Sequence, residues 1–519
     1  MSFTSLKELI ELAEKGNTTI AQIMLKTEEE QKGIPKHQLL EKMSEQLGVM
    51  EEAVRKGTES PVKSRTGLTG GDGYRMKLYA KKGMSFIDPR TLDTLSYALS
   101  VSEVNAAMGR IVATPTAGSA GILPAVLIHA LESGRFKRDE IVLSMFTASA
   151  LGLVIANKAS ISGAAGGCQA EVGSATAMAA GTLVELAGGT PSQVGNAVGI
   201  ALKNSLGLVC DPVAGLVEIP CIIRNGLHAI TAQAAADMAL AGVNSVIPAD
   251  EVIYVMHEVG QQMPESLRET GIGGLAGTPT GKKLMGQVFN KKTGSQPAKY
   301  QSAYEIIGPI MVGPSSSHTA GAVRIGSIAN QLLNEKPVHV KFSLMGSFAE
   351  TYEGHGTDVA LLAGVLGLAT SDENVPHAKQ LAEQNDLSYE FTKRILGSYH
   401  PNTVLIELEG ETRRIKILAS SLGGGKVEVQ ELDDYPLKFS GERPTLVIRH
   451  IDKQGFLAEL SNILNKHGYN IARLGLERAK KGGAAVTICE VDERSVTTII
   501  PILKKELAIL EDILLVHLP

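Results

Sequence analysis

Apolar residues recur at helical spacing along the first half of the chain. Near its start, one face of a predicted helix carries four apolar residues, Leu6, Leu9, Ile10 and Ala13. From 125 to 250 the sequence is dominated by long runs of Ala, Gly, Val, Ile and Leu. Small residues let neighbouring helices approach one another closely. We therefore predict a compact, all-helical domain over residues 1–292.

The pattern changes after a polar stretch at 291–300, which contains Gly and Pro and is typical of a linker. A helical run over 320–333 is followed by two segments, 338–344 and 403–408, in which apolar and polar residues alternate. Such alternation predicts strands with one buried face. Residues 293–440 are therefore expected to form an α/β domain.

The last part of the chain alternates between strand and helix patterns. We expect strands at 445–449, 470–477, 485–491 and 513–518, and helices at 456–466 and 496–506. The resulting order, βαββαβ, is ferredoxin-like and predicts a third domain over 441–519. Cys489 falls in one of these strands, so we expect it to be a core residue.

Composition narrows the class of protein. The length of 519 residues fits three domains of roughly 150 residues each. A net charge of −5, 4% aromatic residues and no tryptophan give no indication of a nucleic-acid partner. The start of the chain has no basic segment followed by an apolar one, so we expect a cytoplasmic protein. The most apolar run, 141–156, is short for a bilayer and predicts a buried helix with no membrane partner.

Three of the four cysteines, Cys168, Cys210 and Cys221, fall in the stretch from Ala164 to Asn225. Each has Gly or Pro within two residues, which predicts positions at helix ends or in turns. Thiolates are soft ligands for iron–sulfur clusters and zinc, and three of them leave one position open for a substrate. Free cysteine is also among the most buried residue types. The residues alone leave both interpretations open, a shared metal site and three structural cysteines.

Two motifs resemble a known family. The alpha part of iron–sulfur-dependent L-serine dehydratases is similar to two stretches around the cysteines. They read Gly-Gly-Cys168-Gln-Ala-Glu-Val-Gly-Ser and Cys210-Asp-Pro-Val-Ala-Gly-Leu-Val-Glu-Ile-Pro-Cys221. Gly313-Pro-Ser-Ser-Ser-His318-Thr-Ala-Gly resembles their beta part. The resemblance implies a [4Fe–4S] cluster on the three cysteines and conversion of L-serine to pyruvate and ammonia.

The same resemblance suggests which residues handle the substrate. A base must take the Cα proton, and histidine is the commonest choice. His318 is the better candidate and His355 the second, with Asp358 orienting a ring. Four hydroxyl residues of the same loop, Ser315, Ser316, Ser317 and Thr319, are candidate contacts of the substrate carboxylate or ammonium. Without the family, either histidine would more often be structural.

Three further segments could contribute to the site. Thr116 and Ser119 precede an apolar run, where hydroxyls and free N–H groups make either an anion site for a carboxylate or a plain helix cap. Arg224 could pair with the carboxylate or with a negative cluster, or it could be a surface charge at a helix end. The polar loop 63–72 is either an ordinary connection or, by resemblance, close to the active site.

The glycine-rich stretch 421–426 could be a phosphate loop, but its position between predicted strands favours a tight turn. Residues 441–519, with Asp452-Lys-Gln-Gly455 at the first turn, resemble an ACT domain. That resemblance implies an amino-acid effector and pairing of these domains in a homodimer.

Three rival functions were weighed. A dehydratase dependent on pyridoxal phosphate would need a Schiff-base lysine and a phosphate loop in a recognisable setting, and it would leave the cysteines unexplained. If the protein were only an amino-acid sensor based on the ACT domain, the motifs around the cysteines and around His318 would have no function. A zinc hydrolase would differ in its metal content.

Overall fold

The computed structural model describes residues 3–288, 303–352, 355–394, 400, 402–478, 480–493, 496–507 and 509–518. The predicted linker at 291–300 lies outside these ranges. The chain divides into two compact units. The first comprises Met1–Ala320, Glu350–Gly356 and Gly423–Gly425, and the second Gly321–Ala349, Thr357–Leu422 and Lys426–Pro519. The proposed domain boundaries after 292 and 440 remain predictions.

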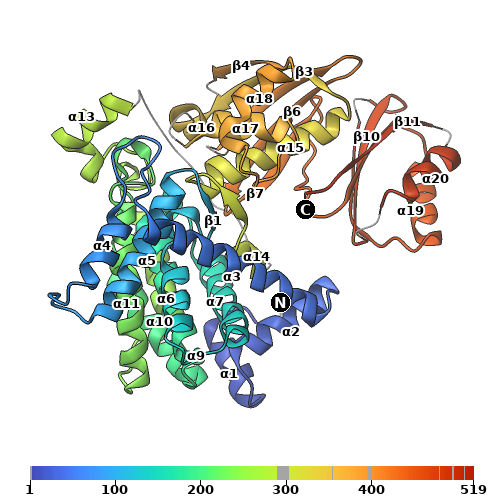
Figure 1. Cartoon of the computed structure of the whole chain (residues 1–519). Helices are drawn as coiled ribbons and strands as arrows, with labels where there is room; N and C mark the ends of the chain where they lie inside the picture. Colours follow the sequence, from blue (N-terminus) through green and yellow to red (C-terminus); the bar gives the residue numbers. More distant parts are fainter. Residues whose placement is uncertain are drawn as a thin grey trace. The chain divides into compact units, whose positions relative to one another are not determined.

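Helices make up most of the first unit (Figure 1). They are α1 (Leu6–Lys15), α2 (Ile20–Lys32), α3 (Lys36–Glu59), α4 (Asp72–Ala80), α5 (Pro89–Ala106), α6 (Ile122–Glu132), α7 (Arg138–Lys158), α8 (Gly163–Gly166), α9 (Ser174–Leu186), α10 (Pro191–Ser205), α11 (Cys221–Leu240), α12 (Ala249–Gln262), α13 (Pro279–Val288) and α14 (Ala303–Ile306). The Ala- and Gly-rich α9 packs on α7, α10 and α11, as small residues permit. One apolar core runs through these helices.

Local sequence explains where the first helices begin and end. The side chain of Ser5 accepts a hydrogen bond from the backbone N–H of Glu8 and caps α1, which ends at Gly16. Thr19 caps α2 in the same way through the N–H of Gln22. These hydroxyls satisfy backbone donors that a helix start leaves free. The predicted break between the first two helices is confirmed.

The most apolar helix, α7, is a core element. Within the described residues it is the one helix long and apolar enough to cross a membrane, and 83% of its apolar window is buried inside the structure. A core helix of a folded protein meets the same criteria of length and composition. The predicted buried helix over 141–156 is confirmed.

The first unit is not all-helical as predicted. β1 (Arg110–Val112) pairs antiparallel with β2 (Ile310–Val312), with Ile111 opposite Met311. The two strands are three residues long and almost 200 positions apart in sequence. No alternating pattern develops over three residues, so the sequence carries no periodic signal for this pair.

The second unit begins with a mixed five-stranded sheet of order β4-β3-β5-β6-β7. Its elements are β3 (Pro337–Met345), β4 (Ser388–Lys393), β5 (Thr403–Gly410), β6 (Arg414–Gly423) and β7 (Lys426–Leu432), with α15 (Gly321–Leu333), α16 (Gly346–Thr351), α17 (Thr357–Val365) and α18 (Ala378–Gln384). β3 pairs parallel with β4 and antiparallel with β5. The helix predicted at 320–333 and the strands at 338–344 and 403–408 are all present.

The C-terminal segment forms its own sheet. Its elements are β8 (Thr445–Ile451), α19 (Phe456–Lys466), β9 (Ile471–Arg478), β10 (Ala484–Val491), α20 (Ile499–Glu506) and β11 (Leu510–Val516). The strand order is β11-β8-β10-β9, and all three pairings are antiparallel. Cys489 is fully buried in β10 within an apolar cluster, as expected of a core residue. Whether this segment is an ACT domain remains a proposal.

Candidate active site

The three cysteines of the central stretch lie at helix ends and in turns of the first unit. Cys168 precedes a single π-helical turn, Gln169–Gly173, a deviation from α-helix that is frequent at functional sites. Cys210 lies beyond α10, where its carbonyl accepts a hydrogen bond from the N–H of Glu269 at 2.7 Å. Cys221 is the first residue of α11, after Pro220. All three are free, buried thiols, which confirms the positions expected from the neighbouring Gly and Pro residues.

The thiols lie close enough to perturb one another. Ligand atoms of Cys168, Glu171 and Cys210 are all within 4.8 Å of each other. A hydrogen bond to Cys168 and burial raise the pKa of Cys210. Burial and the neighbouring Cys168 likewise raise the pKa of Cys221. Soft, buried donors that repel one another when ionised fit a cationic metal group, because a cation favours the thiolate form of each.

Arg224 is part of this cluster rather than a surface charge. Its side chain is 16% exposed, and its Nη2 lies 3.0 Å from Oδ1 of Asp211. Its Nη1 donates to the carbonyl of Val209 at 2.8 Å. Burial opposes the charged form, but the nearby Cys168 and Asp211 raise the pKa of Arg224 overall, and the guanidinium also bonds to Cys168. Arg224 therefore pairs with the negative groups around the cysteines, Asp211 and Cys168.

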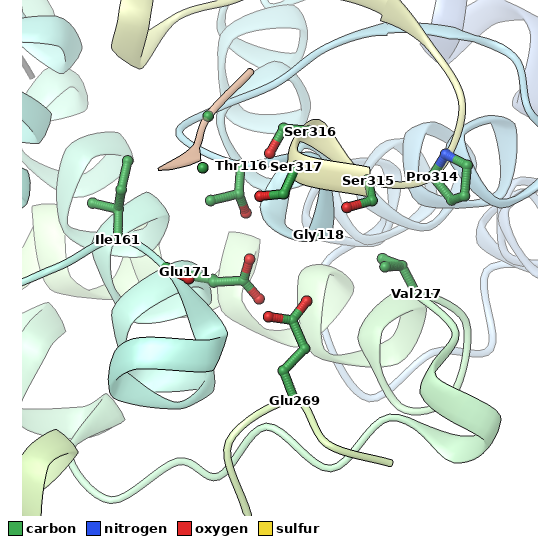
Figure 2. Close-up of a pocket in the computed structure, with 13 residues that line it drawn as sticks. Thr116, Gly118, Ile161, Glu171, Val217, Glu269, Pro314, Ser315, Ser316 and Ser317 are labelled. Carbon is green, nitrogen blue, oxygen red and sulfur yellow. The ribbon is translucent and has the colours of Figure 1, made fainter. Parts of the chain in front are cut away.

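A pocket with about 370 Å³ of empty space, part of it open to solvent, lies beside the cysteines. Figure 2 shows the carboxylates of Glu171 and Glu269 turned toward one another, across from the segment Ser315–Ser317. The lining residues are Thr116, Gly118, Ile161, Ser162, Glu171, Val217, Glu269, Pro314, Ser315, Ser316, Ser317, Gly423 and Gly424. Four of the predicted substrate contacts are among them. Two others, Ser119 and Thr319, are fully buried and do not line it.

The predicted anion site at Thr116 and Ser119 has the wrong surroundings for a carboxylate. The two hydroxyls lie 3.1 Å apart, and Ser119 donates to the carbonyl of Thr114 at 3.1 Å. The side chain of Thr116 also bonds to the carboxylate of Glu171. Only a three-residue 3-10 turn, Ala117–Ser119, follows. These hydroxyls therefore fix the loop and Glu171, and neither of them caps a helix through its side chain.

Glu171 and Glu269 are functional candidates that the sequence analysis missed. Burial raises the pKa of Glu171 to about 7, although hydrogen bonds from Thr116 and the N–H of Gly163 lower it. Burial and the charge of Glu171 raise the pKa of Glu269 as well. Glu171 stands three residues after Cys168 in the quoted motif, a signal that could have identified it. Glu269 belongs to no motif, and only the fold brings it to the pocket.

The serine-rich loop holds His318 firmly. Within the loop, Ser316–Ala320 forms a second π-helical turn. Oγ of Ser315 accepts the backbone N–H of His318 at 3.0 Å and lies 3.3 Å from Nδ1 of the ring. The ring of His355 stacks on that of His318 with centroids 4.4 Å apart. Thr319 donates to the carbonyl of His355 at 2.9 Å, so its hydroxyl joins these two segments.

His355 and Asp358 have separate environments. Burial lowers the pKa of His355 to about 4, so its ring is neutral near pH 7. Its Nδ1 has no hydrogen-bond partner among the described residues. Asp358 forms an ion pair with Lys379 at 2.6 Å. The predicted role of Asp358 in orienting a histidine ring therefore gains no support.

The loop at 63–72 is bound to the cysteine segment. Thr66 and Thr69 donate hydrogen bonds to the carboxylate of Glu218 at 2.9 and 2.8 Å. Glu218 lies between Cys210 and Cys221 in sequence and is 5% exposed. The loop therefore fixes the stretch that carries two of the cysteines, which agrees with its expected place near the site.

The glycine-rich stretch 421–426 is the tight turn between β6 and β7 that the sequence predicted. Gly423, Gly424 and Gly425 have φ of 106°, 60° and 79°, values that residues with a Cβ rarely adopt. Gly423 and Gly424 also line the pocket and belong to the first unit. The turn was predictable from the sequence, but its location beside the pocket was not.

Comparison with known proteins agrees with both motif resemblances. The family model described as serine dehydratase alpha chain matches residues 15–276, and that of the serine dehydratase beta chain matches 302–431. The probable L-serine dehydratase alpha chain of Bacillus subtilis is 53% identical over 294 residues, which are 57% of this chain and 98% of that protein. The probable beta chain from the same organism is 43% identical over 195 residues, 38% of this chain and 89% of that protein.

A third relative is also similar. The L-serine dehydratase of Streptomyces coelicolor is 42% identical over 278 residues, which cover 52% of this chain and 59% of that protein. Alpha and beta matches follow one another along the sequence without overlap. The chain belongs to the serine dehydratase family, with the alpha-chain and beta-chain regions in one polypeptide.

Proposed function

We propose that this chain converts L-serine to pyruvate and ammonia, with a [4Fe–4S] cluster on Cys168, Cys210 and Cys221. The observation that carries the proposal is the convergence of three free, buried thiols from separate segments beside a pocket that the serine-rich loop also lines. The relatives are named L-serine dehydratases, which supports the substrate. The reaction removes a proton from Cα and the hydroxyl from Cβ.

The donor set suits such a cluster. Three thiolates are its ordinary ligands, and the absence of a fourth cysteine near them leaves a position for substrate. When bound there, the cluster supplies Lewis-acid chemistry that assists departure of the Cβ hydroxyl. Arg224 offsets the negative charge of the ligands through its contact with Cys168. The chain's remaining task is to bind serine and move its Cα proton.

His318 is the proposed base. Ser315 and the ring of His355 contact its imidazole, which is buried directly behind the pocket-lining residues Ser315–Ser317 and does not itself line the pocket. The Cα proton passes to His318, the Cβ–O bond breaks, and the departing hydroxide takes up a proton to leave as water, so that return of the Cα proton from His318 to solvent balances the step. The product, 2-aminoacrylate, tautomerises to an imine and takes up one water to give pyruvate and ammonia. No oxidant or reductant is consumed.

Pyruvate release from L-serine tests this function. Protein purified without oxygen should produce pyruvate and ammonia in equal amounts, and air should abolish the activity because exposed iron–sulfur centres are oxidised. A rate that survives air and depends on added pyridoxal phosphate would contradict the proposal. L-threonine serves as the comparison substrate, since one methyl group in a pocket changes kcat/KM by only about 10- to 200-fold.

We also propose that residues 441–519 form an ACT domain that binds an amino-acid effector. The order βαββαβ and the strand order β11-β8-β10-β9 support this assignment. The first turn is well fixed, because Asp452 accepts hydrogen bonds from the N–H of Gly482 at 2.9 Å and from Arg478 at 2.8 Å. These bonds lower the pKa of Asp452.

Equilibrium dialysis of the full chain tests the effector site. The Cys168→Ala variant should lack the cluster and leave L-serine unconsumed, and Asp452→Ala in the same background separates serine bound at the ACT segment from serine bound in the pocket. Binding of labelled L-serine that Asp452→Ala removes supports the ACT proposal. No binding at millimolar serine would count against it, and sedimentation of the same sample tests the predicted homodimer.

A further inference from the structure

We infer that Glu269, together with Glu171, binds the α-ammonium group of the substrate and so selects amino acids over hydroxy acids. The inference rests on the proposed function of the pocket. Both carboxylates line it, and Figure 2 shows them turned toward one another. They come from distant parts of the chain, the π-helical turn after Cys168 and the segment beyond α12.

Two ionised carboxylates side by side in a pocket are costly without a positive charge between them. Glu171 accepts hydrogen bonds from Thr116 and from the N–H of Gly163, and its carboxylate lies within 4.8 Å of the thiols of Cys168 and Cys210. Glu269 accepts a hydrogen bond from the N–H of Ala164, and Glu171 and Cys168 are the charges that act on it. In the described part of the chain, the guanidinium of Arg224 pairs with Asp211 and with neither glutamate. No ion pair within the described residues therefore neutralises either carboxylate.

The facing wall offers a second, independent sign of a ligand. Ser316 is 4% exposed and lines the pocket, yet its hydroxyl has no hydrogen-bond partner among the described residues. Ser317 lies beside it on the same wall. This hydroxyl faces the pocket, so a ligand bound there can supply its hydrogen-bond partner. A small zwitterion carries groups for both walls, an ammonium for the glutamates and oxygens for the serines.

The two glutamates can bind a positively charged group even though they lie close to the cysteine thiolates. The substrate brings the positive charge, and its ammonium donates three hydrogen bonds of the charge-assisted kind. A hydroxy acid of the same size has only a neutral hydroxyl at that position and leaves the carboxylates uncompensated. Specificity therefore arises chiefly from the penalty on the wrong ligand.

Glu269→Gln is the sharpest test, because Glu269 is outside the set of candidate metal ligands while Glu171 contacts Cys168 and Cys210. The readouts are KM and kcat for L-serine and the competitive inhibition constants of L-alanine and propionate. L-alanine has the ammonium and lacks the leaving group, and propionate lacks both. KM and the L-alanine constant should rise about 10- to 100-fold, the cost of losing a hydrogen bond to a charged group. The propionate constant should stay the same or fall.

The matched control is Glu265→Gln, an exposed glutamate four residues earlier that does not line the pocket. It should leave all four constants unchanged. Unchanged KM and L-alanine inhibition in Glu269→Gln would overturn the inference. An equal loss of affinity for L-alanine and propionate would also overturn it, because it would mean general damage. If the unsubstituted protein makes no pyruvate from L-serine, the proposed function itself fails, which is a different result.

Discussion

Cys489 and Cys210 are both buried cysteines, but their surroundings differ. Cys489 lies in β10 among the side chains of one apolar cluster, and burial raises its pKa to about 12. Cys210 lies beside a second thiol and a carboxylate, with Arg224 bound close by. Both are almost inaccessible to solvent. Burial alone therefore does not distinguish a structural cysteine from a proposed metal ligand. The presence of other ionisable groups close to the thiol does.

The same contrast applies to the two units. In the C-terminal sheet of the second unit, the buried His450 bonds to Thr487 on the neighbouring strand. The pocket region of the first unit gathers thiols, carboxylates and hydroxyls, and beside it in sequence the hydroxyls of Thr114 and Thr270 have no partner among the described residues. Natural proteins keep such incomplete polar groups mainly where they are used. The predictions below test this difference, beginning with the largest expected effect.

Replacement of the proposed base should have the largest effect on turnover. His318→Ala removes the group that takes the Cα proton, and kcat should fall about 10²- to 10⁴-fold. Iron content should stay unchanged, because His318 is outside the ligand set. His377→Ala, at an exposed position of the second unit, serves as the control. A His318 variant with kcat within threefold of the parent would remove it from the mechanism.

Arg224→Met should weaken retention of the cluster. The guanidinium contacts Cys168 and offsets the charge of the thiolates, so the variant should lose iron about 10- to 100-fold faster to a chelator. The measurement is the absorbance of the cluster over time in the presence of a chelator, without oxygen. Arg90→Met, at an exposed position, should behave as the parent does. If Arg224→Met and the parent lost iron at the same rate, Arg224 would have no role in retaining the cluster.

His355 should make the first unit sensitive to acid. Its pKa is about 4 in the fold and near 6.5 when unfolded, so between these values the unfolded chain binds the extra proton. Stability is therefore fully present above pH 6.5 and falls as the pH drops toward 4, by about 2 kcal/mol at pH 5. His355→Asn should flatten this slope in urea unfolding curves recorded from pH 7 to 5. A slope identical to that of the parent would contradict the buried, neutral ring.

Cys489→Ala should have the smallest effect. Loss of one buried sulfur from an apolar cluster should cost about 1 kcal/mol of stability, while activity and iron content stay at parental values. Thermal unfolding and iron analysis of the same sample test both parts. Loss of iron in this variant would break the contrast between the two kinds of cysteine.

Long periodic segments and dense motifs were predictable from the sequence. The helices of the first unit, the strands at 338–344 and 403–408 and the βαββαβ order of the last segment all follow from periodicity. The serine dehydratase assignment followed from the motifs around Cys168, Cys210 and His318 and is confirmed by the family matches. These features are local, so a single sequence carries them.

Features that depend on tertiary proximity could not be predicted. Glu269 reaches the pocket only because the segment after α12 folds back on Cys210, where backbone hydrogen bonds hold it. The β1–β2 pair joins two three-residue strands from distant parts of the chain. Thr116, for which the sequence left an anion site and a helix cap open, lines the pocket and bonds to Glu171, a residue 55 positions later. Neither periodicity nor spacing encodes such contacts.

The iron and acid-labile sulfide content of protein purified without oxygen tests the central claim most directly. The parent and Cys489→Ala should each contain about four irons and four sulfides per chain, as a [4Fe–4S] cluster requires. Cys168→Ala, Cys210→Ala and Cys221→Ala should each lose most of both. Zinc in place of iron, or full iron and sulfide in any of those three variants, would contradict the account.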